Sequence, residues 1–164
     1  MTTTDEFADV LAANEAYAAE RPVADLEARA ARGLAVLTCM DSRIEPLAML
    51  GLVPGDAKIL RNAGARVTDD VLRTLVLAAY LLGVQRVMVV AHTGCRMSGH
   101  EEDIHTAVRD AGGPDTRISF LTSTDQESAL RADVQPVRSW PYLGDVTVGG
   151  FLYDLDTGRL QQVC

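Results

Sequence analysis

Two continuous apolar runs constrain the fold of this chain more than any other feature of its sequence. Residues 34–38 read Leu-Ala-Val-Leu-Thr, and residues 87–91 read Val-Met-Val-Val-Ala. A strand with one face in water alternates apolar and polar residues, whereas a strand covered on both faces is apolar throughout, as in parallel sheets. The two runs therefore predict buried strands of a mostly parallel sheet.

Helical and strand patterns alternate around these runs. Thr68-Asp69-Asp70 caps a helix that we expect to end near Leu82, and we expect another helix to break near Pro136. The remaining patterns predict helices over residues 4–20, 24–32, 98–111 and 125–134, and strands over 58–60, 146–155 and 159–163. This alternation predicts an α/β fold with a mostly parallel central sheet flanked by helices. We expect a single domain over residues 1–164, in which residues 1–32 form an N-terminal helical arm.

The composition excludes several kinds of partner. The formal net charge is −8, which argues against nucleic acid and against an anionic membrane surface, because both require a basic face. No apolar run reaches the roughly 18 residues of a membrane span, and the acidic N-terminus does not resemble a signal peptide. We therefore expect a cytoplasmic protein. Its three cysteines, in a reducing compartment, favour metal binding or catalysis over disulfides.

Chemically distinctive residues follow directly after both apolar runs. Cys39-Met40-Asp41-Ser42-Arg43 follows the first, and His92-Thr93-Gly94-Cys95 follows the second. Ligands in parallel α/β sheets bind beyond the carboxyl ends of the strands. Catalytic zinc takes thiolate and imidazole donors and keeps one position for water or substrate. We therefore predict zinc ligands at Cys39, His92 and Cys95, with water or Asp41 in the fourth position.

Other interpretations of these residues are open at this point. The two cysteines could be core residues or form a disulfide, and His92 could be an ordinary turn residue. A cysteine nucleophile activated by His92 is another possibility. A Cys-x5-Arg phosphatase is excluded, because Glu45 and Glu101 stand where its arginine would be. No Gly-x-Gly-x-x-Gly follows the first strand, so nucleotide binding has no support.

Three segments of the chain together resemble the signatures of the β-class carbonic anhydrases. They are Cys39-Met40-Asp41-Ser42-Arg43, Arg61-Asn62-Ala63-Gly64 and His92-Thr93-Gly94-Cys95, in that family's order and approximate spacing. The resemblance covers residues 34–98 well. The short length of the chain is similar to that of compact bacterial members of the family. It implies reversible hydration of carbon dioxide to bicarbonate and a proton by zinc-bound hydroxide.

The resemblance also implies roles for individual residues. The positions that match the family's zinc ligands are Cys39, His92 and Cys95. Asp41 and Arg43 match an ionic pair in which the aspartate can also serve as a fourth zinc ligand. Ala63 and Gly64 match the loop that lines the substrate pocket. The chain departs from the family at Arg96, where glycine is usual; this long cation could crowd the pocket or engage Asp41.

Family members are homodimers or dimers of dimers, with the N-terminal helix lying over the partner. The apolar stripe from Phe7 to Tyr17 suits that role, although such a stripe is also typical of packing within one chain. Relatives that hydrolyse carbonyl sulfide or carbon disulfide give a second functional hypothesis. A third is a zinc-closed structural or sensing protein, in which Asp41 never leaves the metal.

Overall fold

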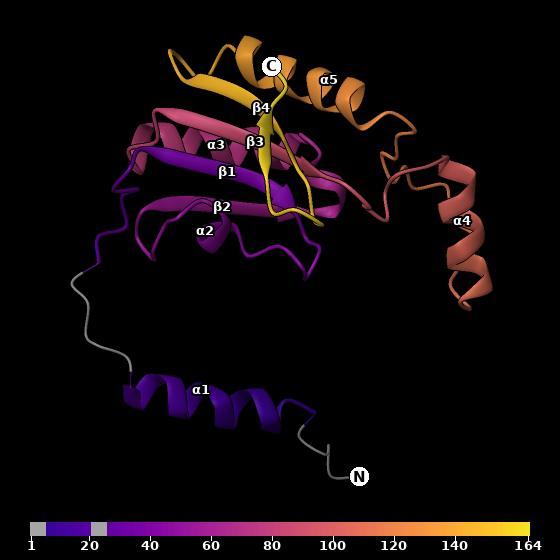
Figure 1. Cartoon of the computed structure of the whole chain (residues 1–164), viewed down its shortest axis with the longest axis horizontal. Coiled ribbons are helices and arrows are strands. Elements are labelled where there is room, and N and C mark those ends of the chain that lie inside the picture. Colours follow the sequence, from indigo (N-terminus) through magenta and orange to yellow (C-terminus); the bar gives the residue numbers. More distant parts are fainter. Residues whose placement is uncertain (1–5, 21–25) are drawn as a thin grey trace.

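A five-stranded sheet organises the computed structural model, which describes residues 6–20 and 26–164 (Figure 1). The strands are β1 (Leu34–Cys39), β2 (Ala57–Asn62), β3 (Arg86–His92), β4 (Thr147–Tyr153) and β5 (Leu160–Gln162). Their spatial order is β2-β1-β3-β4-β5; the first four are parallel, and β5 runs antiparallel to β4. The predicted α/β fold with a mostly parallel sheet is confirmed.

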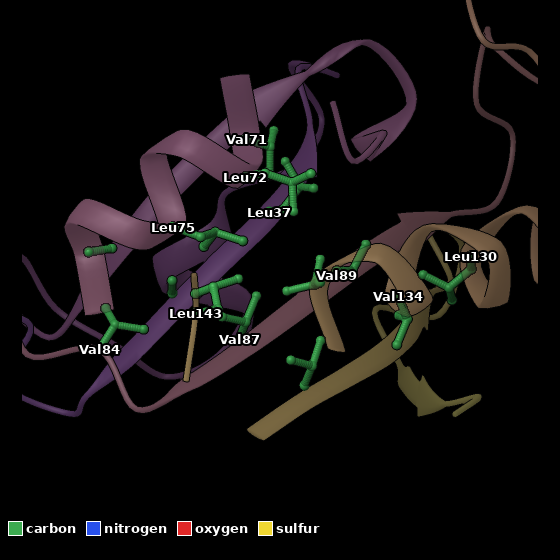
Figure 2. Close-up of a cluster of buried hydrophobic side chains, with 14 of the residues drawn as sticks. Leu37, Val71, Leu72, Leu75, Val84, Val87, Val89, Leu130, Val134 and Leu143 are labelled. Atoms are coloured by element: carbon green, nitrogen blue, oxygen red, sulfur yellow. The ribbon is translucent and has the colours of Figure 1, made fainter. Parts of the chain in front are cut away.

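Two long helices cover one face of this sheet. The helical elements are α1 (Ala8–Glu20), α2 (Pro46–Met49), the short 3₁₀ turn η1 (Ala63–Ala65), α3 (Asp69–Leu81), α4 (Glu101–Asp110) and α5 (Gln126–Ser139). Figure 2 shows Leu75 of α3 and Val134 of α5 packed with Leu37 of β1 and Val89 of β3, in a cluster of buried side chains. This aliphatic layer fixes the strands whose ends carry the candidate site.

The opposite face has a smaller core. Val36 of β1 and Val90 of β3 are fully buried there, against partly buried residues that include Ile59, Phe151 and Tyr153. Both β1 and β3 are therefore covered on both faces, which explains why their sequences are continuously apolar.

The helix predicted over residues 24–32 is wrong for the part that the structure describes. Residues 26–33 form bends and turns, and Ala24 lies outside the described residues. The backbone amides of Ala30, Ala31 and Arg32 donate to carbonyls of distant segments, at distances of 2.8, 3.0 and 2.9 Å. These tertiary hydrogen bonds replace the bonds that a helix would make.

The predicted break near Pro136 is also wrong, because α5 continues to Ser139. Val134 and Val137, on either side of the proline, are buried against the sheet, with at most 2% of their surface exposed. Burial of this face stabilises the helix enough to offset the backbone hydrogen bond that is missing at Pro136. The helix predicted over residues 98–111 begins later, at Glu101, because Ser98 pairs with Ser123.

Helix α1 lies apart from the sheet in Figure 1 and has no buried residue. Val10, Leu11 and Tyr17 are each more than half exposed, so the stripe predicted from the sequence does not pack within the chain. Within residues 6–20 and 26–164, no helix combines the length and apolarity needed to cross a membrane.

Candidate metal centre

The sheet topology brings the two predicted segments to one point. Strand β1 has β2 on one side and β3 on the other, so the order in which the strands are added to the sheet reverses at β1. Thr38 of β1 pairs with Val90 of β3 in parallel register. The next residues, Cys39 and the His92 segment, therefore leave the same edge of the sheet. This position, beyond the carboxyl ends at a reversal of strand order, is where open α/β sheets bind ligands.

Cys39, His92 and Cys95 converge there. One ligand atom from each lies within 4.8 Å of the other two, and all three residues are buried. The two sulfur atoms are 3.9 Å apart, and both thiols are free, so no disulfide forms. Tetrahedral zinc with Zn–S bonds of about 2.3 Å separates two sulfurs by about 3.8 Å. The spacing of the cysteines therefore fits zinc and not a covalent bridge.

The imidazole of His92 is oriented for a metal. Its Nδ1 lies 2.8 Å from the carbonyl oxygen of Thr93, to which it donates, so Nε2 carries the free lone pair. Nε2 is buried, and within the described part of the chain it has no hydrogen-bond partner. Burial lowers the pKa of His92, which keeps the ring neutral. A buried, neutral and unpartnered nitrogen is what a metal ligand requires.

The sulfur atoms also fit a cation. Burial raises the pKa of the Cys95 thiol to about 11, so a thiolate there needs a positive charge beside it. Backbone N–H groups approach both sulfurs: Gly64 N lies 3.4 Å from Cys39 Sγ, and Met97 N lies 3.5 Å from Cys95 Sγ. Two thiolates and one imidazole form a donor set that zinc prefers.

Asp41 and Arg43 form a bidentate ion pair beside these donors. Arg43 Nε and Nη2 donate to the two carboxylate oxygens at 2.9 and 2.6 Å, and the Arg43 backbone N–H adds a third bond of 3.0 Å. These bonds hold the pKa of Asp41 well below its usual range. Asp41 Oδ2 is 3.9 Å from His92 Nε2, so the carboxylate is adjacent to the donor set but turned toward Arg43. Arg43 also donates to the Gly94 carbonyl oxygen at 3.1 Å, which joins the two site loops.

An open pocket of about 510 Å³ leads to these groups. Ala63 lines it together with Asp41 and Cys95, whereas Gly64 does not; its N–H instead faces Cys39. Arg96 lines the pocket and is exposed, and it makes no ion pair with any residue in the described ranges. Asp41 is paired with Arg43 and not with Arg96.

The sequence interpretation gave no individual role to Arg61. Its Nε donates to the Cys39 carbonyl oxygen at 3.0 Å and its Nη2 to the Asp41 carbonyl oxygen at 2.6 Å, so it holds the backbone on both sides of Met40. A signal for it was present: the charged Arg61 follows the apolar pair Ile59 and Leu60 near the carboxyl end of β2. A cation at the carboxyl end of a parallel strand lies at the edge of the sheet where ligands bind.

Comparison with known proteins identifies the family. The family profile described as "Carbonic anhydrase" matches residues 34–160, which is more than half of the chain. The chain belongs to the β-carbonic anhydrase family. Its similarity to Beta-carbonic anhydrase 1 of Mycobacterium tuberculosis is 33% identity over 165 residues, covering 99% of both chains. Among solved structures, carbonic anhydrase from Streptococcus mutans superposes with a TM-score of 0.88 at 37% identity, covering 96% of this chain and 97% of that one.

A relative with a different named activity is also similar to this β-carbonic anhydrase family member. Carbon disulfide hydrolase of an Acidianus strain is 31% identical over 158 residues, covering 80% of this chain and 77% of the relative. The family and the enzyme class predicted from the sequence are thus confirmed. The similarity to this relative shows that the same fold also serves a protein named for another substrate.

Proposed function

We propose that the chain hydrates carbon dioxide reversibly to bicarbonate and a proton, with zinc held by Cys39, His92 and Cys95. The observation that supports this most is the convergence of these three donors beside a carboxylate that Arg43 holds away from them. Three protein donors leave a fourth position for chemistry. Zinc, when bound, lowers the pKa of a water ligand and so supplies a nucleophile near neutral pH.

Asp41 and Arg43 orient the nucleophile in this proposal. The low pKa of Asp41 keeps its carboxylate ionised at any physiological pH, so it always accepts a hydrogen bond and never donates one. The bidentate contact with Arg43 fixes the carboxylate plane, and the bond from Arg43 to Gly94 fixes that plane relative to the His92 loop. An acceptor in a fixed position aligns the nucleophile's lone pair with the substrate carbon.

In this proposal Ala63 forms a wall of the substrate pocket, and Gly64, the next residue, donates its N–H to Cys39 Sγ. The small methyl group of Ala63 leaves room for a linear triatomic molecule next to Asp41 and Cys95. The net charge of −8 does not attract anions, which is compatible with a neutral substrate and favours departure of the bicarbonate product.

Asp41 also has a second state in this proposal, as a fourth zinc ligand that closes the site. Entering that state would break the three hydrogen bonds from Arg43. The Arg43 pair therefore favours the open state, which argues against a protein that is permanently closed and purely structural.

Stopped-flow measurement of carbon dioxide hydration by zinc-loaded protein tests the proposal. Cys95→Ser should lose both zinc and activity, whereas the matched Cys164→Ser should keep them. Cys164 is a suitable control because its sulfur lies against Gly150 and not in the pocket. A metal-free parent protein with thiol-dependent hydrolase activity would refute the proposal.

The second candidate function is hydrolysis of carbon disulfide or carbonyl sulfide at the same site. The similarity to a carbon disulfide hydrolase over 80% of the chain is the observation that favours it. The two functions are separated by measuring sulfide release from carbon disulfide with the protein preparation that is used for stopped-flow hydration.

We also propose a homodimer, or a dimer of dimers, in the cytoplasm, built from a single domain from which α1, within the predicted arm of residues 1–32, extends. The exposed side chains of Val10, Leu11 and Tyr17 on α1 give an apolar surface that a second copy of the chain would cover. The reduced Cys39 and Cys95 thiols suit a reducing compartment.

A further inference from the structure

A strained turn carries the N–H group that faces Cys39. The turn is η1, where Gly64 has φ +78° and Ala65 has φ +58°. Glycine adopts this left-handed conformation freely, whereas in alanine the Cβ crowds the following carbonyl oxygen and the conformation is strained. Ala65 is also buried, with 2% of its surface exposed. Strain of this kind persists only where the surrounding structure holds it in place.

Two side chains hold this turn. The Asn62 amide closes a ring on the backbone of Arg66, donating from Nδ2 to its carbonyl oxygen at 2.7 Å and accepting its N–H at 2.8 Å. Asp133, which is buried on α5, pairs with Arg66 Nε at 2.6 Å and accepts the Val67 N–H at 3.3 Å. One clamp is local and the other comes from a helix packed into the main core.

The turn that these two side chains hold also makes the contact between Gly64 N and Cys39 Sγ. The proposed site has a chemical need for such a contact, because two thiolates donate so much charge that they oppose the acidifying effect of the metal. An N–H hydrogen bond withdraws charge from a thiolate and makes it a weaker donor. The corresponding donor to Cys95, Met97 N, lies only two residues away in the same turn and needs no remote support.

We propose that Asn62 and Asp133 are positioning residues that hold the Gly64 N–H against Cys39 Sγ, and that this bond weakens the electron donation of Cys39 to the metal. The inference rests on the proposed metal site. It assigns a role to a strained turn and to a buried carboxylate that lies 94 positions beyond Cys39 in the chain. Neither residue touches the substrate pocket at Asp41.

Scalar coupling across hydrogen bonds provides a direct test. Protein labelled with ¹⁵N and loaded with ¹¹³Cd should show coupling between cadmium and two amide protons, those of Gly64 and Met97, transmitted through the sulfurs. Asn62→Ala should abolish or strongly reduce the Gly64 coupling and leave the Met97 coupling unchanged. Asp133→Asn keeps the side-chain volume and should reduce the same coupling, so it serves if Asn62→Ala does not fold.

Cobalt supplies a second readout. Loss of an N–H bond raises the energy of the sulfur electrons, so the sulfur-to-cobalt charge-transfer band of Co²⁺-loaded Asn62→Ala should move to longer wavelength. A role limited to fold stability would lower the melting temperature without moving this band.

The outcomes separate the two proposals. Cadmium bound by Cys39, His92 and Cys95 without Gly64 coupling in the parent protein would overturn this inference alone. Coupling and charge-transfer bands that both variants leave unchanged would also overturn it. Failure of cadmium to bind through these three residues would overturn the proposed metal site, and this inference with it. Coupling in a protein without hydration activity would support the inference and refute the proposed reaction.

Discussion

Replacement of Arg61 by methionine should weaken metal binding without unfolding the protein. Arg61 makes two hydrogen bonds, of 3.0 Å to the Cys39 carbonyl oxygen and 2.6 Å to the Asp41 carbonyl oxygen. Methionine keeps most of the aliphatic volume and removes both donors. The backbone from Cys39 to Asp41 would then have to be ordered when the metal binds, and that cost would appear in the metal affinity.

The magnitude follows from the exposure of these bonds. A buried hydrogen bond from a charged donor contributes about 1.5–3 kcal/mol. Arg61 is an exposed residue, so water competes for its donors, and we take about 1 kcal/mol for each bond. The total of about 2 kcal/mol corresponds to a decrease of about 30-fold in metal affinity.

Competition with a chelator of known affinity measures this change. Arg117→Met is the matched control, because Arg117 is exposed and its side chain has no hydrogen bond or ion pair with any residue that the structure describes. The control should bind zinc as the parent does. If Arg61→Met also bound zinc with parental affinity, the Cys39–Asp41 loop would be held without Arg61, and the reasoning would be refuted.

Three further predictions concern stability and assembly. Leu75→Ala should lower the free energy of unfolding by about 2–5 kcal/mol in urea titrations, because Leu75 is fully buried, whereas Leu77→Ala at a 45% exposed position should cost much less. Backbone N–H donors lower the pKa of Glu101, so the ionised carboxylate stabilises the fold above the ordinary pKa of 4.5, and this stabilisation is lost as the pH falls. The difference in urea midpoint between the parent and Glu101→Gln should therefore shrink in acid. A difference that stays constant with pH would contradict this. Val10→Glu with Leu11→Glu should shift light-scattering mass toward the monomer if α1 carries the proposed dimer contact, and an unchanged mass would remove α1 from it.

The parts of the fold that could be predicted from the sequence are those with local signals. The continuous apolar runs of β1 and β3, the acidic start of α3, and the turn between the strands predicted over residues 146–155 and 159–163 all lie in the structure where these patterns place them. The turn is a clear case, because the Asp154 side chain accepts the Asp156 and Thr157 N–H groups within a few residues. Because parallel strands end at the same edge of a sheet, the predicted ends of these two strands then placed Cys39 and His92 at one edge.

The parts that could not be predicted depend on contacts between distant segments. Residues 26–33 include helix-forming residues, but the amides of residues 30–32 bond to the carbonyls of Leu82, Gly55 and Asp56. The Asp133 carboxylate accepts a hydrogen bond from the Val67 amide, which lies 66 positions earlier in the chain, and neither local sequence predicts this contact. Arg61 was visible as a charge directly after Ile59 and Leu60, yet its two carbonyl partners lie 20 and 22 positions earlier.

The pairing of β1 with β3 has a consequence for how the proposed metal would be exchanged. Cys39 and Cys95 are 56 positions apart, and closing a chain segment of that length costs entropy. The pairing of five residues of β1 with five of β3 in the sheet offsets this entropy cost. We therefore expect the metal-free chain to fold with its donors already assembled, unlike a zinc finger that is unfolded without its ion. Metal should enter and leave at a rate set by opening of the Asp41–Arg43 loop, far faster than the chain unfolds, and the apoprotein should be rebuilt into holoprotein without any refolding step.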